Sequence, residues 1–158
     1  MQQAPCRETV DLSGYPDLVV ILLGLQARRL RAFLSLRDVG RGLAAIQRTP
    51  PDGLLSHQSL RFGWNHVGFR QYWRDYESLE AFTRAAPHAD WWRHFMQQGR
   101  GCGFWHEAYS ARGGMEAIYV DMPQRTGFAA FAPVVAPEGR RRFSRARLAE
   151  HAGRAAAV

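Results

Sequence analysis

The strongest pattern in the chain is an apolar run near its start, Leu18–Gln26 (LVVILLGLQ). Apolar residues at successive positions predict a strand that is covered on both faces. Over 27–48 the period changes, and apolar residues recur near helical spacing with arginines between them. This pattern predicts a helical segment, which Gly40 and Gly42 divide into two pieces. The sequence TPPDG at 49–53 ends the segment, because proline and glycine do not continue a helix.

A hairpin is predicted next. Residues 54–62 and 65–73 have the composition of strands, and the Gly63-Trp64-Asn65 stretch forms the turn between them. Side chains alternate between the two faces of a strand. One face of the second strand therefore carries four residues: His66, Gly68, Arg70 and Tyr72.

Two helices follow the hairpin. Asp75 is suited to cap the first helix, because its carboxylate can accept from the unpaired backbone amides of the first turn. Pro87 interrupts the apolar stripe of this helix and fits the first position of a new one. We expect the second helix at His88–Gln98, with Trp92 and Phe95 on the same face as His88.

Two more strands are predicted after a glycine-rich joint, at Phe104–Ser110 (FWHEAYS) and Glu116–Met122 (EAIYVDM). In the first of these, Glu107 shares a face with Tyr109, whereas His106 points to the opposite face. One of these two neighbours is therefore expected under the helices and the other toward a dimer interface or the rim. The pattern does not decide which.

The element order is β-α-β-β-α-β with one further strand. A right-handed crossover and a hairpin give a mainly antiparallel sheet with both helices on one face. This order predicts an α+β protein with a ferredoxin-like fold. The other face of the sheet is apolar and needs a cover, and a second copy of the chain is the simplest one.

Charge is distributed unevenly along the 158 residues. The formal net charge is +7, and every basic residue counted in it is an arginine. Six of these arginines lie in 139–158, beside a single acid. We therefore predict a domain at 1–138 and a basic tail at 139–158, with a helix from Phe143 onward. A solvated end is the default interpretation of such a tail. Nucleic-acid recognition would depend on this tail alone, so we predict no nucleic-acid partner.

Two cysteines, Cys6 and Cys102, form no disulfide framework, and we read both as free thiols in a reducing compartment. A nucleophilic role for Cys102, which lies between glycines, stays open. No signal peptide is recognised at the start of the chain. The longest apolar run, eight residues from Leu18 to Leu25, is far short of a membrane span. We expect a cytoplasmic protein without a membrane partner.

Three stretches carry a family resemblance: YWRDYESLEAF at 72–82 with Pro87-His88 after it, HADWW at 88–92, and GFWHEAYSARGGMEAIYVDMP at 103–123. The chain resembles dimeric α+β barrel proteins of the antibiotic-biosynthesis-monooxygenase type. More narrowly, it resembles a bacterial domain family of formerly unknown function that is grouped with a fungal polyketide monooxygenase.

This resemblance implies a homodimer with a small-molecule pocket between sheet and helices in each subunit. The resemblance does not settle the chemistry, because the superfamily contains cofactor-free oxygenases, haem-dependent oxygenases and dehydratases, isomerases and proteins without known activity. Our first hypothesis is an oxygenase or related oxidoreductase that acts on a bulky apolar or aromatic small molecule, in natural-product biosynthesis. A haem-dependent dehydratase or lyase and a non-catalytic haem or small-molecule binding protein therefore remain alternatives.

Candidate catalytic residues are His106, Glu107 and His66. His106 or Glu107 is the expected general base, since either group can take a proton near neutral pH when its surroundings shift its pKa. The alternative for Glu107 is an ion pair with Arg70 that holds strands together. His88 is the expected haem ligand, because haem-binding relatives use a helix histidine, and its alternative is a hydrogen-bonded core histidine.

Substrate contacts are expected from four residues: Arg70, Trp92, Trp64 and Asn65. Arg70 can hold a carboxylate by paired hydrogen bonds, and Asn65 can steady a developing oxyanion. Tryptophans suit a flat aromatic ligand, although a buried tryptophan is more often part of a core. We predict no metal site, and no phosphate-binding glycine loop or HExxH motif is present.

Overall fold

The computed structural model describes residues 9–30, 32, 36–37, 40, 46–98 and 101–155, with the backbone alone at 98, 127 and 151–155. Its strands are β1 Val19–Ala27, β2 Leu54–Gly63, β3 His66–Trp73, β4 Cys102–Ser110 and β5 Met115–Val120. Its longer helices are α2 Tyr76–Arg84, α3 His88–Gln98 and α4 Ser144–Ala155. Two short 3-10 helices, η1 Gly127–Ala130 and η2 Gly139–Arg142, lie between β5 and α4.

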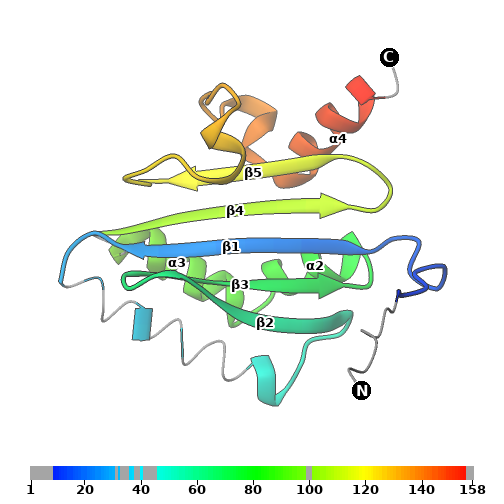
Figure 1. The fold of residues 1–158 in the computed structure, drawn as a ribbon, viewed down its shortest axis with the longest axis horizontal. Coiled ribbons are helices and arrows are strands. Elements are labelled where there is room, and N and C mark those ends of the chain that lie inside the picture. The colour runs from blue at the N-terminus through cyan, green and yellow to red at the C-terminus, as the bar shows by residue number, and fades with distance from the viewer. Residues whose placement is uncertain are drawn as a thin grey trace, which may run out of the picture.

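The strands form one sheet in the order β2-β3-β1-β4-β5, and each neighbouring pair is antiparallel (Figure 1). The apolar strand β1 is therefore paired on both sides, with Ile21 opposite Gln71 of β3 and Ala108 of β4. This order is the ferredoxin-like arrangement with β5 added at one edge. The predicted α+β fold is confirmed.

Most predicted elements occur close to their expected bounds. The hairpin turns at Trp64 and Asn65, and α3 spans the predicted residues. Asp75 caps α2 by accepting from the backbone amide of Ser78 at 2.6 Å. The predicted helical segment 27–48 starts too early, because Ala27 ends β1 and 28–30 are not helical. Of its other residues, 32, 36–37, 40 and 46–48 are helical, and 31, 33–35, 38–39 and 41–45 lie outside the described residues.

Helices α2 and α3 lie behind the sheet in Figure 1. Apolar side chains of the sheet and of these helices pack together in two clusters. One buried cluster lies near the start of β1 and contains Val19, Ile21, Trp73, Leu79 and Ala108. A second lies near its end and contains Leu25, Ala27, Ala32 and Cys102. We call this face of the sheet the helix side.

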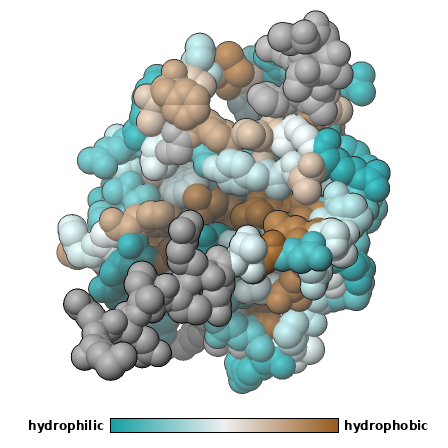
Figure 2. All heavy atoms as spheres, turned by 45° about the vertical axis from the view of Figure 1, so that its right-hand side comes forward, coloured by the Kyte–Doolittle hydropathy of each residue, from teal (hydrophilic) through white to brown (hydrophobic). Residues whose placement is uncertain are grey.

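The opposite face of the sheet, which we call the open side, has few covering elements in the described chain. Val20 and Leu22 of β1 and Arg70 and Tyr72 of β3 are only half-buried there. Seen obliquely, apolar residues gather in a band across the middle of the molecule, with polar residues around it (Figure 2). This distribution fits the expectation that the face needs a cover.

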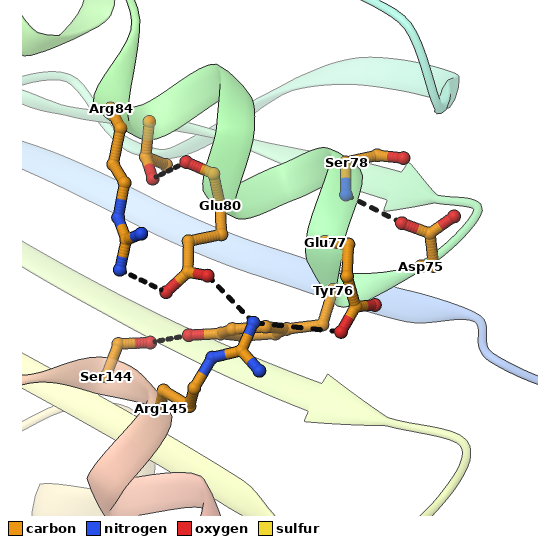
Figure 3. A network of polar contacts seen from close by, with 9 residues as sticks. Asp75, Tyr76, Glu77, Ser78, Glu80, Arg84, Ser144 and Arg145 are labelled. Atoms are coloured by element: carbon orange, nitrogen blue, oxygen red, sulfur yellow. Dashed lines mark hydrogen bonds and ion pairs between the residues drawn. The ribbon is translucent and has the colours of Figure 1, made fainter.

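Helix α4 packs against β5 and is tied to α2 by polar contacts (Figure 3). The hydroxyl groups of Tyr76 and Ser144 are hydrogen-bonded, and Arg145 pairs with Glu80 at 2.7 Å and with Glu77 at 3.7 Å. The predicted helix in the basic segment is confirmed. Two arginines of this segment, Arg145 and Arg147, pair with Glu80 and Glu116 of the predicted domain, so the helix that carries them is not simply a solvated end.

No helix in the described part of the chain is both long and apolar enough to cross a membrane.

Candidate active site

His106 lies on the helix side of β4, between Leu23 of β1 and Ile118 of β5. Its side chain is 19% exposed, and its Nδ1 lies 3.4 Å from Oε1 of Glu116, whose side chain is fully buried. Burial lowers the pKa of His106, against the opposing effect of the Glu116 carboxylate. A neutral imidazole whose Nδ1 faces a carboxylate presents its Nε2 as a base.

His88, at the start of α3, has a defined tautomer. Its Nδ1 lies 3.1 Å from the backbone oxygen of Thr83. A carbonyl oxygen only accepts, so Nδ1 carries the proton and Nε2 keeps its lone pair. Burial lowers the pKa of His88, while the bond to Thr83 acts in the opposite direction. The ring is therefore held neutral with Nε2 available for a proton or a metal.

Aromatic side chains flank these two histidines on the helix side. The ring centroids of Phe82 and His88 lie 4.9 Å apart, and those of Phe82 and Trp73 lie 5.3 Å apart. One turn further along α3, the ring of Trp92 lies 5.1 Å from that of Phe104, edge to face. Phe104 is on the same face of β4 as His106. The histidines are thus set among apolar aromatic walls of the kind that suits a flat ligand.

A chain of three polar side chains reaches the same side from β3 and β2. The indole of Trp73 donates to Oε1 of Gln71 at 3.2 Å, and Nε2 of Gln71 lies 3.2 Å from Nδ1 of His57. With Nδ1 of His57 accepting, its Nε2 carries the proton. That buried Nε2 has no hydrogen-bond partner among the described residues. Sequence reasoning missed His57, since a lone histidine on an edge strand has no motif around it.

Glu107 faces the open side, away from His106. It is 2% exposed, and its carboxylate accepts from the hydroxyl groups of Tyr109 at 2.6 Å and Tyr119 at 2.5 Å. The backbone amide of Phe128, in η1, donates to it at 2.6 Å. The alternative of an ion pair with Arg70 is not what the structure shows, because both carboxylate oxygens have these other partners and Arg70 donates to Gln58. Glu107 therefore joins β4, β5 and η1.

His66 also faces the open side, where it accepts a hydrogen bond from the indole of Trp105 at 2.9 Å. Indole nitrogen only donates, so Nε2 of His66 is unprotonated. The two rings meet over Gly24 of β1, where an added Cβ would lie 2.3 Å from the indole nitrogen. His66 therefore lies on the opposite face of the sheet from His88 and His106.

The other residues predicted to contact a substrate lie on the open side or at the hairpin turn. Arg70 donates to Oε1 of Gln58 at 2.5 Å on the open side. Asn65 donates to the backbone oxygen of Ala27 at 2.8 Å, and Trp64 is 81% exposed. Both turn residues line a cavity of about 540 Å³ at the end of β1, whose walls are Gln26, Ala27, Arg28, Arg29, Leu30, Trp64, Asn65, Pro123 and Gln124.

The structure therefore brings together three predicted site residues on the helix side: His88, Trp92 and His106. The open side receives His66, Arg70 and Glu107. Sequence reasoning missed Glu116, which becomes recognisable only from its register opposite Ala108 on the helix side. We call His88, Trp92, His106 and Glu116 the helix-side site.

Neither a nucleophilic cysteine nor a metal site is supported by the described residues. Cys102 is buried, and burial raises the pKa of its thiol to about 11, which opposes a nucleophilic role. Within the described ranges, no group of three or more His, Cys, Asp and Glu side chains is placed to hold a metal ion.

The fold and the site together define a class of protein: a ferredoxin-like α+β domain with histidines between its sheet and its helices. The family model described as "Monooxygenase af470-like" matches residues 18–128. The chain belongs to this family. Its β5 strand is inside the matched region and its helix α4 is outside it. A comparison with curated proteins finds no match.

Solved structures with a similar fold are distant in sequence. A protein of unknown function from Bacteroides thetaiotaomicron, described as a possible oxidoreductase, is 10% identical, with a TM-score of 0.49 over 60% of this chain and 98% of that one. SnoaB, a cofactor-independent oxygenase from Streptomyces nogalater, is 14% identical, with a TM-score of 0.42 over 68% and 95%.

The aldoxime dehydratase OxdRE, crystallised with butyraldoxime, is 23% identical, with a TM-score of 0.48 over 75% of this chain. This chain spans only 34% of that enzyme.

Proposed function

We propose that this protein is a monooxygenase-like enzyme that oxidises a bulky apolar or aromatic small molecule, in natural-product biosynthesis. The substrate lies on the helix side, with His106 as the general base. Membership of the monooxygenase family supports the class of reaction. The observation that supports the site is the partly buried, neutral His106 beside the buried Glu116, among the aromatic rings of Trp92 and Phe104.

The proposed chemistry needs a substrate with an acidic CH2 group, or a phenol whose anion carries its charge on a ring carbon that bears a hydrogen. Nε2 of His106 takes the acidic proton, and the electron pair left on carbon forms a bond to dioxygen. The proton then passes from His106 to the reduced oxygen, which gives a hydroperoxide. Loss of water then breaks the O–O bond and removes the remaining hydrogen of that carbon, which leaves one oxygen atom on the product as a carbonyl.

Oxygen uptake tests this proposal. Purified protein is mixed with a panel of polycyclic phenols and ketones, and dioxygen consumption is followed with an electrode. Replacing His106→Gln should lower the rate about 100-fold, as loss of a general base commonly does. His94→Gln is the matched control, because His94 is an exposed histidine on the outer part of α3. A folded His106→Gln protein with the wild-type rate would exclude His106 as the base.

A haem-dependent dehydratase or lyase is the second candidate, and one observation favours it. His88 donates its Nδ1 proton to a backbone carbonyl and leaves Nε2 free, which is the usual arrangement of a histidine that binds iron. Bound haem would supply a redox-active iron at this position. His88 would hold it, and Trp92 on the same helix face would pack against the ring. The same features would serve a non-catalytic haem-binding protein.

Haemin titration separates these candidates. An absorption band that saturates at one haem per chain, and is lost in His88→Ala, supports haem binding. A protein that consumes oxygen with a substrate but binds no haemin supports the cofactor-free mechanism.

We also propose that the open side is covered by a second copy of the chain. The half-buried residues on this face support a homodimer, since a single copy leaves its apolar band in water. Light scattering at micromolar concentration should give twice the chain mass. A monomeric mass would leave the open side without the proposed cover.

A further inference from the structure

Glu116 is a buried carboxylate with different partners at its two oxygens. Arg147 of α4 donates to Oε2 through Nε at 2.7 Å and lies 2.6 Å from it through Nη2. Oε1 faces Nδ1 of His106 at 3.4 Å and has no hydrogen-bond partner in the described part of the chain. The side chain of Glu116 is 0% exposed, so its negative charge is balanced by these neighbours and not by water.

Arg147 is itself held in place. Its Nη1 donates to the backbone oxygen of Arg141 at 2.7 Å, and its side chain is 15% exposed. The contacts of Tyr76 with Ser144 and of Glu80 with Arg145 fix the start of α4 against α2 (Figure 3). The guanidinium therefore reaches Glu116 from a helix that is anchored at a second element.

We propose that Arg147 is a positioning residue for His106, acting through the buried carboxylate of Glu116, so that α4 completes the helix-side site. This inference rests on the proposed function for the chemical task of His106. It adds a residue outside the region 18–128 that the family model matches.

The charged groups around His106 show how Arg147 affects the protonation of its imidazole. Glu116 on β5 and Glu107 on β4 favour a protonated imidazole, whereas Arg147 on α4, and His88 on α3 when it is protonated, oppose it. Burial opposes the charged ring most strongly. Without Arg147, Glu116 would be a buried anion whose remaining charge partner among the described residues is His106, and a proton on His106 would supply the missing charge. Arg147 thus allows Glu116 to orient His106 without protonating it.

The test is an NMR titration of the imidazole of His106, which needs neither substrate nor cofactor. The His106 signals are assigned by their loss in His106→Gln. In Arg147→Met the pKa of His106 should rise by about one pH unit, since removal of a nearby cation favours the protonated ring. In Glu116→Gln it should fall. Opposite shifts from the two partners of one ion pair are not expected from a general loss of packing.

Arg141→Met is the matched control. It removes an arginine that pairs with Glu150 at 2.5 Å on the exposed surface, and it leaves the backbone oxygen that Arg147 uses. The pKa of His106 should be unchanged in this variant. An unchanged pKa in Arg147→Met, or an equal shift in Arg141→Met, would overturn the inference.

A buried anion left by Arg147→Met can prevent folding. The double variant Arg147→Met/Glu116→Gln removes that anion. The pKa of His106 in the double variant should exceed that in Glu116→Gln alone, because the repulsion from Arg147 is gone. Equal values in these two proteins would overturn the inference.

Oxygen uptake keeps this inference separate from the proposed function. A raised pKa in Arg147→Met in a protein that oxidises no tested substrate would support the positioning role and count against the oxygenase.

Discussion

At the scale of single residues, Glu107 is a buried carboxylate that needs hydrogen-bond donors from three other residues. Two tyrosine hydroxyls and one backbone amide donate to its buried carboxylate. Burial and the bond to Glu107 raise the pKa of Tyr109 and of Tyr119, so both phenols stay protonated and keep donating. Three good donors offset the cost of removing a carboxylate from water. The residue stabilises the junction of β4, β5 and η1.

Replacing Glu107→Ala should lower the free energy of unfolding by about 3 kcal/mol, because three buried donors lose their acceptor. Urea denaturation followed by tryptophan fluorescence measures this loss. Tyr119→Phe is the control and should cost about 1 kcal/mol, since it removes one donor and leaves the carboxylate with two. A Glu107→Ala protein as stable as wild type would show that the network contributes little.

Arg147 is the residue that sequence reasoning was least able to find. It lies in a basic segment where six arginines have similar neighbours along the chain. Only packing distinguishes them: Arg141 pairs with Glu150, Arg145 with Glu80, and Arg147 with the buried Glu116. The proposed positioning role depends on this difference in burial.

At the scale of elements, the start of α2 depends on a local signal. Asp75 accepts from the amide of Ser78 and also pairs with Arg74 at 2.8 Å. Its hydrogen bonds to the Arg74 side chain and to Ser78 lower its pKa to about 2. The carboxylate is therefore charged at neutral pH, where it favours the positive end of the helix.

Replacing Asp75→Ala should destabilise the protein by about 1 kcal/mol, the usual cost of losing an N-cap. Asp52→Ala is the control, because it removes the other acidic partner of Arg74 and leaves the cap intact. Equal losses in the two variants, measured by chemical denaturation, would assign the effect to Arg74 rather than to the cap.

At the scale of the whole molecule, buried histidines couple stability to pH. Burial lowers the pKa of His57, His66, His88 and His106 below the ordinary value of 6.5. The unfolded chain thus binds protons more readily than the folded one. The stability that these neutral rings contribute is present above pH 6.5 and is lost as the pH falls through their folded pKa values.

The free energy of unfolding should therefore decrease as the pH is lowered from about 7 to 5. One group adds a slope of at most about 1.4 kcal/mol per pH unit between its two pKa values. Denaturation at several pH values gives the slope. In His66→Gln, which keeps an acceptor for Trp105, the decrease should be smaller than in wild type. A free energy that rises toward pH 5 would contradict the assignment of neutral histidines.

The sequence alone determined the elements and their faces, because periodicity and capping act over a few residues. The continuous apolar run predicted the central strand β1, Asp75 predicted the start of α2, and alternation separated His106 from Glu107. It also supported the ferredoxin-like order and the family, because both follow from local motifs taken in sequence.

Only the tertiary structure decided which face lies under the helices. It placed His106 there and Glu107 on the open side, a choice that depends on strand register across the sheet. It also joined Glu116 to Arg147, which are 31 residues apart in the chain. No local pattern encodes such a pair, because burial and charge balance arise only when distant segments pack together.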